Sequence, residues 1–129
     1  MGKLLCVLLA EDDVSVRNLM ILRLQHLGHS VRAAEDGRQA LDLALGEDHF
    51  DLVLMDVQMP EMDGLEAIRH LRANPATRAL PILVVSATGT ADGMQAGADH
   101  FLGKPHTKAQ LQAAIAHTFE MRAIHDGEA

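Results

Sequence analysis

Residues 52–64 read LVLMDVQMPEMDG, and this stretch carries the most information about the fold. Four consecutive apolar residues, 52–55, favour a strand buried on both faces, as in a parallel sheet that helices cover on each side. Asp56 follows this strand directly. Open α/β sheets bind their ligands beyond the carboxyl ends of their strands. The stretch therefore predicts a carboxylate aimed at a binding crevice.

The same alternation extends along the chain in both directions. Short apolar runs predict strands at residues 4–9, 30–33, 52–55, 81–85 and 101–102, with apolar residues at helical spacing between them. Asp63 with Glu66, and Thr107 with Gln110, have the spacing of helix capping boxes. Five successive β–α units predict a doubly wound parallel sheet with helices on both faces.

Composition narrows the class of protein. A chain of 129 residues suits one domain with one core. The net charge of −7 disfavours direct binding to nucleic acid or to an anionic membrane, and no stretch is long enough to span a bilayer. No cleavable leader is evident, so a cytoplasmic protein is expected. The single cysteine, Cys6, lies in the first apolar run and is expected to be buried and reduced.

Polar residues follow four of the predicted strands. Glu11 and Asp12 come after the first strand, Asp56 after the third, Ser86 after the fourth and Lys104 after the fifth. The carboxyl ends of parallel strands meet at one edge of the sheet. Three carboxylates there repel one another, and a bound Mg²⁺ is the natural counter-charge. A carboxylate also serves as a nucleophile towards a phosphoryl group, whose charge a metal, a lysine and a hydroxyl would neutralise.

Each residue also has a simpler interpretation when it is taken alone. Asp56 would be a solvated loop residue, Lys104 a surface lysine, Ser86 a strand-end hydroxyl and Phe101 a core residue. Three further aspartates precede predicted helices and are interpreted as N-caps: Asp13, Asp36 and Asp63. The eight histidines show no zinc-site spacing with the cysteine.

Five sequence segments, in this order along the chain, favour the combined site over the separate interpretation of each residue. They are Glu11-Asp12, residues 55–64, residues 81–87, residues 97–99 and residues 101–105. Together they resemble the response-regulator receiver domains of two-component signalling across essentially the whole chain. The resemblance implies a flavodoxin-like fold with strand order 2-1-3-4-5. We expect a receiver domain over residues 1–124, a frayed tail over 125–129 and no output domain in this chain.

The resemblance also implies roles for the site residues. Asp56 would be the phosphoacceptor, and Mg²⁺ would be held by Asp56, Glu11, Asp12 and the backbone carbonyl of Gln58. Ser86 would hydrogen-bond the phosphoryl group, and Lys104 would pair with it.

Further positions are implied to act around that centre. Phe101 occupies the position of an aromatic switch residue that moves with Ser86. Gln58 and Thr88 would adjust hydrolysis of the phosphoryl group. The peptide bond between Lys104 and Pro105 is implied to be cis.

The resemblance further implies a phosphohistidine donor, on a sensor histidine kinase or a histidine phosphotransfer protein. The protein would be a signalling switch that catalyses only its own phosphorylation and dephosphorylation, as a monomer or a phosphorylation-dependent dimer. A phosphatase of the haloacid dehalogenase type needs a second aspartate two residues after the nucleophile, where this chain has Gln58. The glycine patterns of nucleotide-binding loops are absent. A pseudo-receiver that only binds proteins stays as the alternative.

One segment departs from the family pattern. The stretch between Ser86 and Lys104 is about four residues short, roughly one helical turn. It contains three glycines, Gly89, Gly93 and Gly97, each of which costs a helix about 1 kcal/mol relative to alanine. We therefore predict a shortened or irregular fourth helix, as little as a single turn, and a non-standard partner surface.

Overall fold

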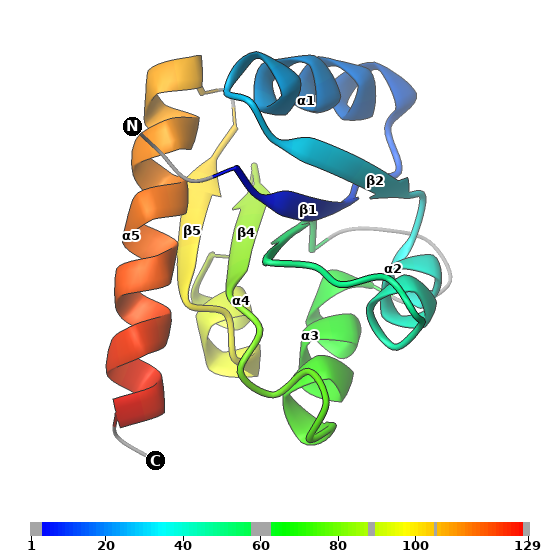
Figure 1. Cartoon of the computed structure of the whole chain (residues 1–129), viewed down its shortest axis with the longest axis vertical. Helices are drawn as coiled ribbons and strands as arrows, with labels where there is room; N and C mark the ends of the chain where they lie inside the picture. The colour runs from blue at the N-terminus through cyan, green and yellow to red at the C-terminus, as the bar shows by residue number, and fades with distance from the viewer. Residues whose placement is uncertain (1–3, 58–62, 88–89, 105, 128–129) are drawn as a thin grey trace.

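The structure, a computed structural model, describes residues 4–57, 63–87, 90–104 and 106–127. Strands and helices alternate along the described chain (Figure 1). Their bounds are β1 Cys6–Ala10, α1 Val14–His26, β2 Ser30–Ala34, α2 Gly37–Ala44, β3 Leu52–Met55, α3 Gly64–Ala73, β4 Ile82–Ser86, α4 Thr90–Ala96, β5 His100–Gly103 and α5 Lys108–Gly127.

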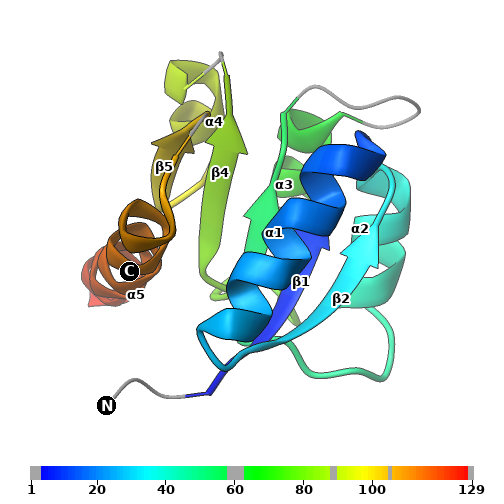
Figure 2. The same cartoon turned by 90° about the horizontal axis from the view of Figure 1, so that it is seen from above.

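The strands form one parallel sheet in the order β2-β1-β3-β4-β5, which confirms the predicted fold. Helices α1 and α5 cover one face of the sheet, and α2, α3 and α4 cover the other (Figure 2). Strands β1 and β3 are neighbours, and Ala10 pairs with Met55 at their carboxyl ends. This register brings Glu11 and Asp56, the next residue of each strand, side by side.

Strand β3 is the centre of the core, as the run at residues 52–55 predicted. All four of its side chains are buried. Val53 and Met55 pack in the apolar cluster on the α2–α4 face, whereas Leu52 and Leu54 pack in the cluster on the α1–α5 face. Burial of each such side chain contributes about 1.5–3 kcal/mol. The strand that carries Asp56 is thus held firmly from both sides.

Side-chain caps begin four of the described helices, as expected. The carboxylate oxygens of Asp13, Asp36 and Asp63 accept hydrogen bonds from the backbone N–H groups of α1, α2 and α3 at 2.8–3.0 Å. At the start of α5 the capping box is complete: Thr107 N–H donates to Gln110 Oε1 (2.8 Å), and Gln110 N–H donates to Thr107 Oγ1 (3.0 Å). These aspartates therefore serve as caps.

Helix α4 is the shortest helix in the described residues, which confirms the expected shortening. Its seven residues make about two turns, so the prediction of a single turn was wrong. Within this helix, a Cβ at Gly93 would lie 2.9 Å from Val84 Cγ2. The glycine that weakens the helix also lets it pack closely on β4.

Two other expectations were wrong. Cys6 is exposed, because it is the first residue of β1 and its register partner Ser30 is exposed too. The frayed tail does not begin at residue 125, since α5 continues to Gly127 and His125 Nδ1 lies 2.8 Å from Asp99 Oδ1. Residues 128–129 lie outside the described part. Within that part, no helix combines the length and apolarity needed to cross a membrane.

Candidate functional site at the carboxyl edge of the sheet

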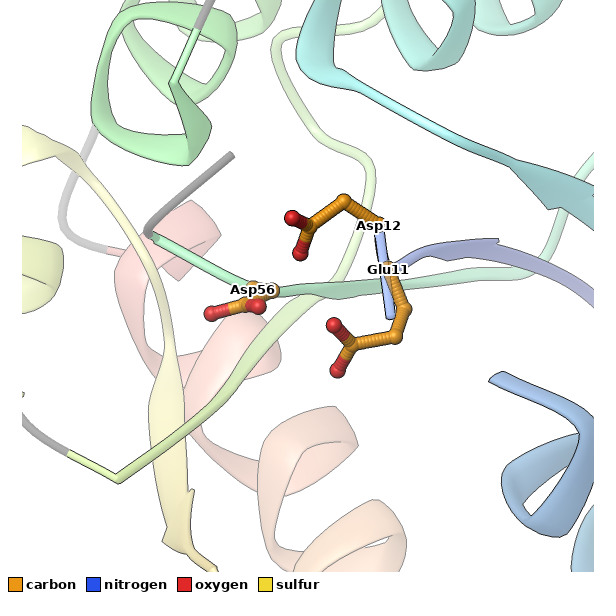
Figure 3. A group of neighbouring side chains, drawn as sticks. All are labelled: Glu11, Asp12 and Asp56. Atoms are coloured by element: carbon orange, nitrogen blue, oxygen red, sulfur yellow. The ribbon is translucent and has the colours of Figure 1, made fainter. Parts of the chain in front are cut away.

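Three carboxylates gather beyond the ends of β1 and β3: Glu11, Asp12 and Asp56. One oxygen of each lies within 4.8 Å of the others. Figure 3 shows the three carboxylate groups facing a common space. Backbone hydrogen bonds fix two of the residues, since Asp56 N–H donates to Ala10 O and Glu11 N–H donates to Ala34 O, both at 3.0 Å. The sheet ladder itself therefore positions this cluster.

The cluster concentrates negative charge where water is scarce. The side chains of Glu11 and Asp56 are buried, whereas Asp12 is exposed. Burial raises the pKa of Glu11 above its ordinary value, Lys104 opposes that rise, and the neighbouring Asp56 adds to it. Such a set of oxygen ligands favours a divalent cation with a preference for oxygen.

Lys104 reaches this cluster from the end of β5. Its Nζ forms an ion pair with Glu11 and lies 3.6 Å from Asp56 Oδ2. Its backbone N–H donates to Ser86 O at 3.3 Å, which joins the end of β5 to the end of β4. The structure thus brings together five of the residues singled out in the sequence, with Ser86 buried at the end of β4.

Phe101 lies on β5 with 40% of its surface exposed. The interpretation of Phe101 as a core residue is therefore wrong, and a switch role stays a prediction. Its ring centroid is 5.8 Å from that of His100. Burial and the nearby His117 lower the pKa of His100.

Three predicted positions lie outside the described residues: Gln58, Thr88 and Pro105. The backbone ligand at Gln58, the adjustment of hydrolysis by Gln58 and Thr88, and the cis peptide bond at Pro105 therefore stay predictions.

Sequence reasoning missed Gly64. Gly64 N–H donates to Val57 O at 3.1 Å, and a Cβ on Gly64 would lie only 2.0 Å from the carbonyl oxygen of Asp56. Glycine lets the start of α3 touch the backbone of the phosphoacceptor candidate. The available signal was a glycine placed directly after an N-cap, where a better helix former is usual.

Two arginines of α1 were also missed. Arg17 Nη1 donates to the backbone oxygens of Glu11 (2.9 Å) and Asp12 (3.3 Å). Arg23 Nη1 donates to His106 O (2.7 Å), shortly after Lys104. Both arginines hold backbone segments that bear site residues. No sequence pattern pairs Arg23 with a residue 83 positions away.

A family model described as the response regulator receiver domain matches residues 7–116. The chain therefore belongs to the response regulator receiver domain family, the receivers of two-component signalling. The chain is 39% identical over 125 residues to response regulator MprA of Mycolicibacterium vanbaalenii, covering 94% of this chain and 53% of that protein. It is 35% identical over 127 residues to MprA of Mycobacterium ulcerans, with 95% and 53% covered. The chain spans about half the length of these relatives.

Solved structures agree with this assignment. The chemotaxis response regulator CheY4 of Vibrio cholerae superposes with a TM-score of 0.83 at 30% identity, covering 90% of this chain and 99% of that one. The receiver domain of sensor histidine kinase PA1611 from Pseudomonas aeruginosa superposes with a TM-score of 0.80 at 33% identity, with 86% and 93% covered. That structure has a magnesium ion coordinated in its active-site cleft.

Proposed function

We propose that Asp56 accepts a phosphoryl group from a phosphohistidine donor and that the protein signals through the resulting change of its surface. The observation that carries this proposal is the convergence of two further carboxylates and Lys104 on a buried carboxylate at the end of β3. The donor would be a sensor histidine kinase or a histidine phosphotransfer protein.

The residues fit Mg²⁺. Glu11, Asp12 and Asp56 offer oxygen ligands only, and one oxygen from each lies within 4.8 Å of the others, which suits one small hard cation. The related PA1611 receiver carries magnesium in its cleft, which supports the same ion here. When bound, Mg²⁺ would supply positive charge to the phosphoryl oxygens.

The chain's own groups account for the rest of the transfer. An oxygen of Asp56 attacks phosphorus as the bond from phosphorus to the donor histidine nitrogen breaks, and the nitrogen keeps the electron pair. Lys104 Nζ, 3.6 Å from Asp56 Oδ2, is placed to pair with a phosphoryl oxygen. The Ser86 hydroxyl at the end of β4 would donate a hydrogen bond to another.

Readout would pass through Ser86 and the exposed Phe101 on β5. In this proposal phosphorylation shifts an equilibrium between two arrangements of this region. The receiver domain would include the whole of α5, acting in the cytoplasm as a monomer or a phosphorylation-dependent dimer and only on its own phosphoryl group. A pseudo-receiver is less well supported, because competent residue types occupy each described position of the site.

The test is intact-mass spectrometry after incubation with Mg²⁺ and acetyl phosphate. Wild type is expected to gain one phosphoryl mass, and Asp56→Asn to gain none. Asp63→Asn is the matched control, because it removes the same charge while asparagine preserves the N-cap of α3. Absence of the added mass on wild type, or its persistence on Asp56→Asn, would refute the proposal.

A second prediction concerns Asp12. Asp12→Asn removes one of three like charges, so the thermal midpoint in metal-free buffer is expected to rise slightly. The same change removes a Mg²⁺ ligand. Wild type is expected to gain about 2.7 kcal/mol when free Mg²⁺ is a hundred times its dissociation constant, and the variant is expected to lose most of that gain.

Thermal unfolding with and without Mg²⁺ measures both effects. Asp13→Asn is the control, since Asp13 caps α1 through Ser15 and Val16 and asparagine is an equally good cap. An equal loss of Mg²⁺ stabilisation in the two variants would contradict the assignment of Asp12 as a ligand.

A further inference from the structure

A pair of histidines lies at the β5 edge of the sheet, away from β1 and β3, which the residues of the acidic cluster follow. His100 begins β5 and His117 lies in α5, two elements that run side by side in Figures 1 and 2. The centroids of the two imidazole rings are 4.4 Å apart, with an interplanar angle of 61°. Neither ring belongs to the site described above.

This separation is close to the one that a shared metal ion requires. Zn–N bonds are about 2.1 Å long, so two imidazoles at a tetrahedral angle have centroids roughly 5 Å apart. The observed 4.4 Å is shorter and the two rings are in edge contact, so ion binding would require the half-exposed His117 ring to rotate. Imidazole is a preferred ligand of zinc, whereas the carboxylates of the acidic cluster suit magnesium.

Glu120 occupies the position of a supporting carboxylate. His117 Nδ1 lies 3.7 Å from Glu120 Oε2, one helical turn further along α5. Metal-bound histidines usually direct the second ring nitrogen to a carboxylate, which fixes the tautomer. At 3.7 Å the pair is too far apart for a hydrogen bond in this arrangement, but a small approach of Glu120 would place the proton on Nδ1 and leave the lone pair of His117 on Nε2.

The surroundings leave room for an ion and its waters. An open depression of about 420 Å³ is lined by both histidines and by the small side chains of Ala113 and Ala114. Ala113 is four residues before His117, so no long side chain on the preceding turn covers the His117 ring. An ion would reach the pair from solvent.

We propose that His100 and His117 form a binding site for Zn²⁺ that joins β5 to α5, with water completing the coordination. The site would fasten the strand that carries Phe101 to the last helix. The proposal stands independently of phosphorylation at Asp56.

The test is calorimetric titration of the full chain with Zn²⁺ in excess Mg²⁺, which would compete for the acidic cluster, together with NMR of the histidine ring nitrogens. Wild type is expected to bind one Zn²⁺ at this site, with shifts at His100 and His117. His100→Asn and His117→Asn are each expected to abolish that binding. Glu120→Gln is expected to weaken it about tenfold or more.

His49→Asn is the matched control. His49 is largely exposed and its Nε2 lies 3.2 Å from Asp51 Oδ1, so it too has a carboxylate partner but no second histidine within ring contact among the described residues. This variant is expected to bind Zn²⁺ as wild type does. Unchanged circular dichroism and Mg²⁺ binding would show that the histidine variants keep their fold. The proposal is overturned if wild type binds no Zn²⁺ in excess Mg²⁺, or if either single histidine variant retains the binding.

Discussion

Asp99→Ala is expected to lower the free energy of unfolding by about 3–5 kcal/mol, because it breaks a buried ion-pair network from its centre. Asp99 is fully buried. Its Oδ2 accepts hydrogen bonds from Arg72 Nη2 (2.9 Å) and from the backbone N–H of Ile82 (3.0 Å). Its Oδ1 lies 2.8 Å from His125 Nδ1 and 3.5 Å from Arg122 Nε.

The expected loss of stability is large because Arg72 and Arg122 remain in the protein interior after their shared counter-ion is removed. Burial lowers the pKa of Arg72 to about 10, and the positive charge of Arg122 contributes to this, whereas Asp99 opposes it. Arg72 also donates to the backbone oxygens of Leu80 (2.6 Å) and Gly97 (2.8 Å), so it is not free to turn to solvent. Without Asp99 two arginines would share a poorly hydrated site with no central counter-charge.

Urea unfolding measures the change. The matched control is Asp126→Ala, because Asp126 Oδ1 lies 3.4 Å from the same Arg122 Nε but is half exposed. Exposed ion pairs contribute about 1 kcal/mol or less, so this variant is expected to stay close to wild type. Equal losses in the two variants would show that burial of the carboxylate is not what makes the network strong.

Local sequence patterns predicted individual strands and helix caps, which depend mainly on residues close together in the sequence. The apolar run at Leu52–Met55 became a strand buried on both faces, and Asp63 became an N-cap. The strand order and the meeting of Glu11, Asp56 and Lys104 came from the family resemblance together with the rule that parallel strands end at one edge.

The errors and omissions arise where packing overrides local preference. Cys6 lies in an apolar run but is the first residue of β1, and its exposure depends on that position rather than on its neighbours in sequence. His125 lies within α5, where its Nδ1 is 2.8 Å from Oδ1 of Asp99, 26 residues earlier. Tertiary pairings of this kind leave no periodic signal in the sequence.

Gly64→Ala gives the sharpest contrast between local preference and packing. Helix propensity alone predicts a gain of up to about 1 kcal/mol, because alanine replaces glycine in α3. The structure predicts the opposite sign. The added Cβ would lie 2.0 Å from the Asp56 carbonyl oxygen and 2.8 Å from Val57 Cα, and both are backbone atoms that no side-chain rotation moves aside. We expect a net loss of about 3 kcal/mol, at the upper end for overpacking.

The strain would also reach the acidic cluster. Relief requires the backbone at Asp56 or the start of α3 to shift, so the affinity for Mg²⁺ is expected to fall together with the stability. Gly103→Ala is the control, because it lies on β5 beside Lys104 and its added Cβ would meet nothing within 4 Å. Glycine in a strand costs about 0.5–1 kcal/mol relative to alanine, so this control is expected to match or exceed wild type in stability. Urea unfolding and Mg²⁺ titration of both variants measure the two effects. If Gly64→Ala is as stable as Gly103→Ala, the contact between α3 and the Asp56 backbone does not constrain the site.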